Sequence, residues 1–399
     1  MRRLLGWMLA LGACVEVPPY TPPIGVTWIE SPSGTGGVAS SQPVKLHFSG
    51  SSKFPYPDSL QVFGTEVMGQ SALAMCNVED QIGIALYPAP RITSATSALV
   101  NGDNTLVPIL RGPAAVKVKV TWGASYDCSN GNHYPDGSST FTMFPNGRIV
   151  RYDAVHASDD MPAVADSCVS SSCSTDSTWF VTSFWTFDTS QFDGLLAQTL
   201  MSPIDSLPQG MDYEALDSAC VQSGVASSVT VTWREEMQNR ARKPSPTTIA
   251  LIHNIFGGTD IAHLDEPHAN ITSSLTVAAS ACVDGGTPHT DRDIAANAMV
   301  HIADEPVRAG TDGIFGGDGV FTDAPGVSVP ITPFEIVGPT SGPFAVWLRF
   351  PQTLDSMRLE KSIPTSRPWY VPQRVDDDEW IIYFLDPLDG TQTITVNPQ

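Results

Sequence analysis

Histidine and carboxylate side chains gather in one part of the second half of the chain. Five of the eight histidines fall between residues 253 and 301, among several Asp and Glu residues. Imidazole and carboxylate together form the ligand set of zinc and non-haem iron sites. The interval from His263 to His268 differs from the i, i+4 spacing of helical zinc motifs, and Pro267 breaks the segment. The pattern therefore suits either a metal site that uses His253, His263 and His268, or solvated loop histidines.

A glycine-rich stretch offers a second set of metal ligands. Residues 311–323 contain two copies of Asp-Gly followed by a β-branched residue and Phe. Asp312, Asp318 and Asp323 could offer hard oxygen atoms to calcium, the one cofactor that the sequence suggests. Their spacing matches neither the EF-hand loop nor the repeat of calcium-binding β-helices. Asp-Gly pairs also form tight turns, so a hairpin without metal is the alternative.

A third set lies around Pro145-Asn146-Gly147, which predicts a hairpin with a type I′ turn. The set consists of His133, Tyr134, Arg148 and Tyr152. Arginine can neutralise a uronate carboxylate while tyrosine or histidine moves protons, which is the chemistry of β-elimination. The segment resembles the strand-borne sets of large sandwich polysaccharide lyases, and this resemblance implies a catalytic role for the four residues. The alternative is a twisted hairpin with an ordinary polar face.

The first residues of the chain have the pattern of an export signal. Arg2 and Arg3 precede a short apolar run that ends in Leu-Gly-Ala-Cys at residues 11–14. This segment resembles a bacterial lipoprotein signal, which implies removal of residues 1–13 and lipidation of Cys14. The alternative is an ordinary secretory signal. Residues 14–24 are rich in proline and predict an extended tether. We therefore expect an exported protein, lipid-anchored at the cell envelope and delivered to the outer membrane or the surface.

Six cysteines remain after Cys14, and an even number in an exported chain predicts disulfides. The sequence does not choose among their connectivities. Nearness along the chain would pair Cys168 with Cys173, Cys76 with Cys128, and Cys220 with Cys282. Zinc binding by thiolates is disfavoured because the chain has no Cys-x-x-Cys motif.

The elements that must position these residues are strands. Short runs rich in Val, Ile, Thr and aromatic residues recur between Gly, Pro, Asn and Asp, and residues 115–122 alternate apolar and polar types. Only residues 188–201 read as a capped amphipathic helix. The predicted fold class is all-β, with tandem antiparallel sandwiches.

The predicted domains follow from where the strand patterns change. Residues 25–122 begin with a Ser-Pro opening, a strand that ends in Phe-Ser and a Leu-x-Val strand, and they resemble a bacterial Ig-like domain. Residues 328–399 resemble it more loosely and predict a C-terminal β domain. Residues 123–327 are too many for one small Ig sandwich, so we expect a larger sandwich there.

Charge and motifs limit the function. The chain has 21 Lys and Arg against 42 Asp and Glu, a net charge of −21 that excludes a typical nucleic-acid binder. Nucleotide-binding and serine-nucleophile motifs are absent from the sequence. We therefore expect a membrane-anchored lipoprotein with a binding or structural role, toward glycan or another envelope component. The alternative is a carbohydrate-active enzyme, a lyase or hydrolase, with its site in the middle region.

Overall fold

The computed structural model describes most of the strand-forming parts of the chain. These are residues 25–49, 57–68, 72–77, 105–122, 136–156, 179–197, 200–215, 218–233, 239–257, 268–282, 299–302, 305–308, 327–328, 334–337, 344–354, 357–361, 369–385 and 391–398. Within these ranges the regular structure is β-strand with two 3-10 turns, η3 (Thr189–Gln191) and η4 (Ile204–Ser206), and no α-helix. None of the described residues belongs to a helix that could span a membrane. The all-β prediction is confirmed.

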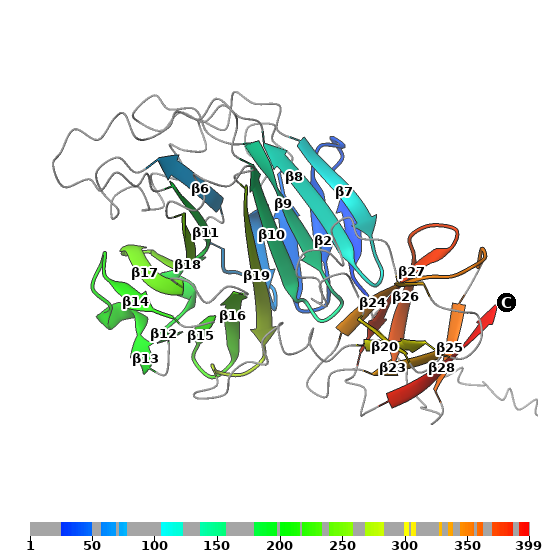
Figure 1. Ribbon diagram of the computed structural model, residues 1–399. Coiled ribbons are helices and arrows are strands. Elements are labelled where there is room, and N and C mark those ends of the chain that lie inside the picture. Colours follow the sequence, from blue (N-terminus) through cyan, green and yellow to red (C-terminus); the bar gives the residue numbers. More distant parts are fainter. Residues whose placement is uncertain are drawn as a thin grey trace, which may run out of the picture.

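The centre of the molecule is a nine-stranded antiparallel sheet. It contains β7 (Thr105–Arg111), β8 (Val116–Trp122), β9 (Asp136–Met143), β10 (Ile149–His156), β12 (Gly194–Ala197), β13 (Leu200–Pro203), β15 (Ser218–Ser223), β16 (Ser227–Trp233) and β19 (His268–Ala278). The strand order is β13-β12-β15-β16-β19-β10-β9-β8-β7 (Figure 1). Neighbours in space are therefore often distant in sequence, as β10 and β19 are.

Two five-stranded sheets pack on one face of this central sheet. The first runs in sequence order through β1 (Thr27–Glu30), β2 (Gly37–Ser40), β3 (Val44–Phe48), β4 (Pro57–Val62) and β5 (Thr65–Glu66). The second contains β6 (Ala72–Asn77), β11 (Trp179–Asp188), β14 (Asp212–Glu214), β17 (Asn239–Ser245) and β18 (Thr248–Gly257), in the order β14-β17-β18-β11-β6. A backbone bridge between Met68 and Phe187 joins the two sheets.

One hydrophobic core is shared by all three sheets. Strand alternation turns Val118, Phe141 and Val231 of the central sheet toward this core, where they pack with Leu46 of the first backing sheet and Leu251 of the second. The opposite side of the central sheet is called the outer face below. The residues of the outer face alternate along each strand with the core residues. They include Lys117 and Thr142, and they are mostly polar.

The C-terminal region is a separate two-sheet sandwich. One sheet has the order β21-β20-β23-β28-β25 and the other β22-β24-β27-β26. Their bounds are β20 (Met299–Ile302), β21 (Glu305–Arg308), β22 (Val327–Ser328), β23 (Phe334–Val337), β24 (Phe344–Arg349), β25 (Met357–Lys361), β26 (Tyr370–Arg374), β27 (Glu379–Phe384) and β28 (Thr391–Pro398). Only the short pair of β22 with β24 is parallel.

The sheets cross both of the predicted boundaries inside the folded body. Strand β8 pairs with β9 along its whole length, so residues 105–122 belong to the central sheet and not to a separate Ig-like sandwich. Strands β20 and β21 precede residue 328, yet β20 pairs with β23 in the C-terminal sandwich. The boundaries fail because local strand patterns carry no information about long-range pairing.

The predicted helix over residues 188–201 is wrong. Asp188 does cap a turn, because its Oδ1 accepts a hydrogen bond of 2.9 Å from the N–H of Ser190, but the turn ends after Gln191. The chain then enters β12, in which all four residues are buried between β13 and β15. Burial of both sides of this strand outweighs the local helix pattern.

The hairpin between β9 and β10 is confirmed, but its turn type is not. Gly147 has a φ of +84°, whereas Asn146 has no positive φ. The N–H of Gly147 donates to the carbonyl of Phe144 at 2.9 Å, and the N–H of Phe144 donates to the carbonyl of Arg148 at 2.9 Å. A three-residue loop with glycine in the left-handed region fits this pattern, whereas a type I′ turn needs two residues with positive φ.

Candidate functional site

The outer face of the central sheet holds a row of side chains suited to a polar ligand. The register places Lys119 of β8 opposite Thr140 of β9, and Thr140 opposite Tyr152 of β10. Lys119 and Tyr152 are partly exposed, and Val107, the partner of Lys119 on β7, is 51% exposed. This part of the outer face is called the open row below, and it brings the partly exposed Lys119 and Tyr152 to either side of the buried Thr140.

Two of the few lysines of this acidic protein lie on the outer face. The chain has only six lysines, and Lys117 and Lys119 are both on this face because they are two residues apart on β8. None of the outer-face residues whose side chains are described is acidic. They are Thr105, Val107, Leu110, Lys117, Lys119, Thr121, Ser138, Thr140, Thr142, Arg148, Val150, Tyr152, Leu196, Met201, Pro203, Ser218, Cys220, Gln222, Ser228, Thr230, Thr232, Ser274, Thr276 and Ala278.

The C-terminal sandwich covers the lower part of the outer face. In Figure 1, β24, β26 and β27 lie beside the lower ends of β7 to β10. The backbone N–H of Ala115 donates to Oε1 of Gln373 at 2.7 Å, and both atoms are buried. The rings of Phe144 and Tyr383 stack with centroids 5.7 Å apart. Lys119 and Tyr152 of the open row are partly exposed and take part in neither of these two contacts.

Arg148 lies within the covered part, so its predicted catalytic role is not supported by its position. The residue is 4% exposed, and its Nε donates to Oγ of Ser274 at 3.1 Å. Burial raises the pKa of the Tyr383 phenol above its usual range, and the nearby Arg148 guanidinium and Asn146 backbone only partly offset this effect. Arg148 and Tyr152 do share one face of the sheet, as the hairpin pattern indicated, but only Tyr152 reaches the surface.

His253 lies elsewhere, inside the shared core. It is fully buried on β18, and its Nδ1 is 2.5 Å from Oδ1 of Asn239 on β17. Because an amide oxygen can only accept, Nδ1 carries the proton, and Nε2 has no hydrogen-bond partner in the described structure. Burial lowers the pKa of His253 to about 4. The metal role of His253 stays a prediction, because its expected partner His263 lies outside the described residues and the side chain of His268 is not described.

The core contains a buried ion pair that we did not predict from the sequence. Arg151 and Asp153 of β10 are both fully buried, and Nε of Arg151 is 2.9 Å from Oδ2 of Asp153. Ser139 donates a hydrogen bond to the same carboxylate. The guanidinium carbon also lies 5.6 Å from the ring centroids of Phe141 and Trp185. The i, i+2 spacing of opposite charges on a strand could have indicated the pair.

The structure describes only some of the other predicted site residues. His268 begins β19, where the backbone register sets it opposite His156 of β10, and His156 is opposite Asp136 of β9. Among residues with described side chains, no group of three His, Cys, Asp or Glu could hold a metal ion. His133, Tyr134, His263, Asp312, Asp318 and Asp323 lie outside the described residues, as do Cys14, Cys128, Cys168 and Cys173, and only the backbone of Cys76 is described.

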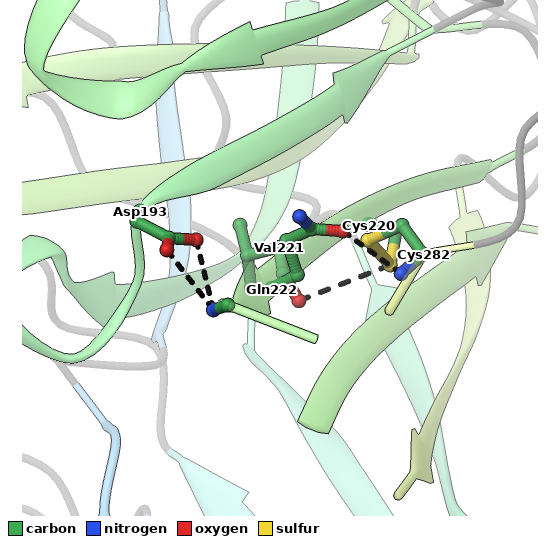
Figure 2. Close-up of a disulfide and its surroundings, with 6 residues drawn as sticks. Asp193, Cys220, Val221, Gln222 and Cys282 are labelled. Carbon is green, nitrogen blue, oxygen red and sulfur yellow. Dashed lines mark hydrogen bonds between the residues drawn. A yellow bond between two sulfur atoms is a disulfide. The ribbon is translucent and has the colours of Figure 1, made fainter. Parts of the chain in front are cut away.

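One predicted disulfide is present. Cys220 of β15 bonds to Cys282, which follows β19 (Figure 2). Thr230 of β16 is the register partner of both Cys220 and Thr276, so the chain after β19 crosses β16 to reach the bridge. The backbone N–H of Cys282 also donates to Oε1 of Gln222 at 3.0 Å. The bridge thus holds this segment on the outer face.

Comparisons with known proteins give no family. No family model matches the chain, and no curated protein matches it. An alpha-N-acetylgalactosaminidase from Bifidobacterium bifidum is 10% identical over 61% of this chain and 36% of its own, with a TM-score of 0.38. A heparan sulfate lyase from Pedobacter heparinus is 7% identical over 65% and 36%, with a TM-score of 0.35. An alpha-mannosidase from Enterococcus faecalis is 8% identical over 64% and 30%, with a TM-score of 0.41. The chain thus spans about a third of each of these proteins, and no activity follows from the likeness.

Proposed function

We propose that the protein is an envelope-anchored, extracytoplasmic lipoprotein that binds an anionic glycan at the open row. The observation that carries the proposal is the row itself, in which the register sets the partly exposed Lys119 and Tyr152 on either side of Thr140. A lysine ammonium suits the carboxylate or sulfate of an acidic sugar, hydroxyl groups suit its hydroxyls, and an aromatic ring can stack on a sugar face. We assign Arg148 no contact with the glycan, because this residue is buried.

Because the whole chain is acidic, binding of an anionic glycan depends on this local arrangement. A net charge of −21 repels an anionic polymer at long range, so binding depends on short-range contact with the few cations of the outer face. We expect affinity to fall when salt screens these contacts. Neutral polymers lack the group that pairs with Lys119 and should bind more weakly.

The test compares polygalacturonate and alginate with neutral dextran in affinity electrophoresis. Lys119→Glu removes one attraction and adds one repulsion, each about 1 kcal/mol for charges 4 Å apart in water. Binding to the acidic polymers should weaken roughly 30-fold, which corresponds to about 2 kcal/mol. Lys45→Glu is the matched control, because Lys45 is an exposed strand lysine on β3, in another sheet. Equal loss in both variants, or equal retardation by dextran, would overturn the proposal.

The anchor is tested separately. Cells that express the protein should incorporate labelled palmitate, and Cys14→Ala should abolish the incorporation. Fractionation would then locate the wild type with the envelope and the variant in soluble export fractions. Unchanged labelling of the variant would contradict the lipid anchor and would leave the glycan test intact.

An enzymatic function is the second candidate, because Tyr152 and Lys119 are both partly exposed in the open row and an acidic polymer is the substrate of β-elimination. Lyase activity creates an unsaturated product that absorbs ultraviolet light. Release of such a product from polygalacturonate or alginate by the wild type, and its loss in Tyr152→Phe, would favour the enzyme. Binding without product favours the binding protein.

A further inference from the structure

The last strand of the central sheet carries exposed apolar side chains beside the open row. Val107 of β7 is 51% exposed, and Ile109 is 42% exposed. The register shifts between Pro108 and Leu110, so Ile109 is the extra residue of a bulge on this edge strand. Exposed edge strands of soluble proteins often carry charged side chains. Two exposed aliphatic residues on β7 therefore indicate a surface that contacts something other than water.

Val107 lies next to a cation and to two hydroxyl groups. It is the register partner of Lys119 on β8, and Thr105 and Thr121 form the next pair on the outer face of the same two strands. Both threonines are exposed. On the β7 side, the open row is thus bordered by an isopropyl group at Lys119 and by hydroxyl groups one pair further along.

The open row suits a ligand longer than one sugar. Tyr152 on β10 and Val107 on β7 are three strand spacings apart, about 14 Å, and Lys119 lies between them. A polymer that crosses these strands can stack one ring on Tyr152, pair a carboxylate with Lys119 and bring a substituent of a further sugar to Val107. Because the side chain of Val107 forms no hydrogen bonds, the substituent that matches it is apolar.

We propose that the ligand of the open row is an acidic glycan that carries acetyl groups, and that Val107 selects for these groups. The inference rests on the proposed function and deepens it. An acetyl group ends in a methyl group, which gains by leaving water for an aliphatic contact, while a carboxylate of the same polymer stays beside Lys119. Burial of one such group contributes about 0.8 kcal/mol, so acetylation should strengthen binding about fourfold.

The experiment uses one polymer in two forms, O-acetylated alginate and the same preparation after its acetyl groups are removed with mild alkali. Both forms carry the same carboxylates, so affinity electrophoresis of the purified protein in each gel isolates the effect of acetylation. The wild type should bind the acetylated form about fourfold more tightly. Val107→Thr keeps a branched side chain of similar shape but replaces a methyl group by a hydroxyl. It should bring the ratio of the two affinities close to one and leave binding to the deacetylated form unchanged.

Ile29→Thr is the matched control, because Ile29 is 61% exposed on β1, the edge strand of the first backing sheet. This variant should keep the fourfold preference. Equal binding of the two forms by the wild type, or a preference that survives in Val107→Thr, would refute the selection of acetyl groups and leave the glycan proposal standing. If the wild type binds neither form, the proposed function fails and this inference fails with it.

Discussion

Replacing His253 should make the fold less sensitive to acid. His253 is fully buried in the shared core and its pKa is lowered to about 4 by burial, from an ordinary value of 6.5. The folded state therefore keeps the imidazole neutral at a pH where the unfolded chain already protonates it. Since the unfolded state binds more protons between pH 6.5 and 4, stability falls as the pH falls through this window.

The size of the effect follows from the two pKa values. A shift of 2.5 units corresponds to about 3 kcal/mol once the pH is below both values. At pH 5 the unfolded chain is almost fully protonated at this residue and the folded chain is still neutral, so the loss relative to neutral pH is about 2 kcal/mol. Such a loss is a large fraction of the stability of an ordinary domain.

The assay is urea unfolding at pH 7.5 and pH 5 for the wild type and His253→Gln. The variant has no group that titrates in this range at the site, so it should lose about 2 kcal/mol less than the wild type on acidification. Other titrating groups are common to both proteins and cancel in the difference. If His253→Gln loses as much stability as the wild type, burial of His253 is not the cause of the acid response.

Three further variants test the packing that supports the outer face, each by urea unfolding at neutral pH. Arg151→Met should cost about 3–5 kcal/mol because it leaves Asp153 buried without its partner, and adding Asp153→Leu should recover part of the loss; no recovery would contradict the pairing argument. Gln373→Leu should cost about 1–3 kcal/mol by leaving a buried backbone N–H without its acceptor, and an unchanged midpoint would contradict this. Replacing Cys220 and Cys282 by serine opens a loop with a sequence separation of 62 and should cost about 2–4 kcal/mol, with reducing agent destabilising the wild type more than the variant.

Strand identity was predictable because it is local. Residues 115–122 alternate in type, and β8 buries the valines and turns both of its lysines to the outer face. The same alternation could have identified Lys117 and Lys119 as a pair of cations on one face. The hairpin after β9 was predictable for the same reason, since Gly147 supplies the positive φ that the turn requires.

Pairing between distant strands was not predictable. The local sequence of β10 does not indicate that this strand pairs with β19, which follows it by more than a hundred residues. That pairing nevertheless sets Arg148 beside Ser274 and His156 beside His268. The domain boundaries failed for the same reason. The false helix at residues 188–201 shows the converse, because a valid cap at Asp188 was followed by a strand whose neighbours bury it on both sides.

The two kinds of cation in the central sheet separate structural from binding roles. A desolvated charge without a partner costs several kcal/mol, so the fully buried Arg151 is paired with Asp153 and its charge is used by the fold. Lys119 is partly exposed and has no ion pair with any residue that the structure describes. The register puts Asp136 on the same face of β9 as Thr140, so the outer face as a whole is not free of acidic residues. Lys119 itself lies opposite Thr140 and Val107, neither of which is charged. Under the proposed function, a ligand that brings its own negative charge to Lys119 meets no Asp or Glu among the register partners of this lysine, and none of them competes for the ammonium group.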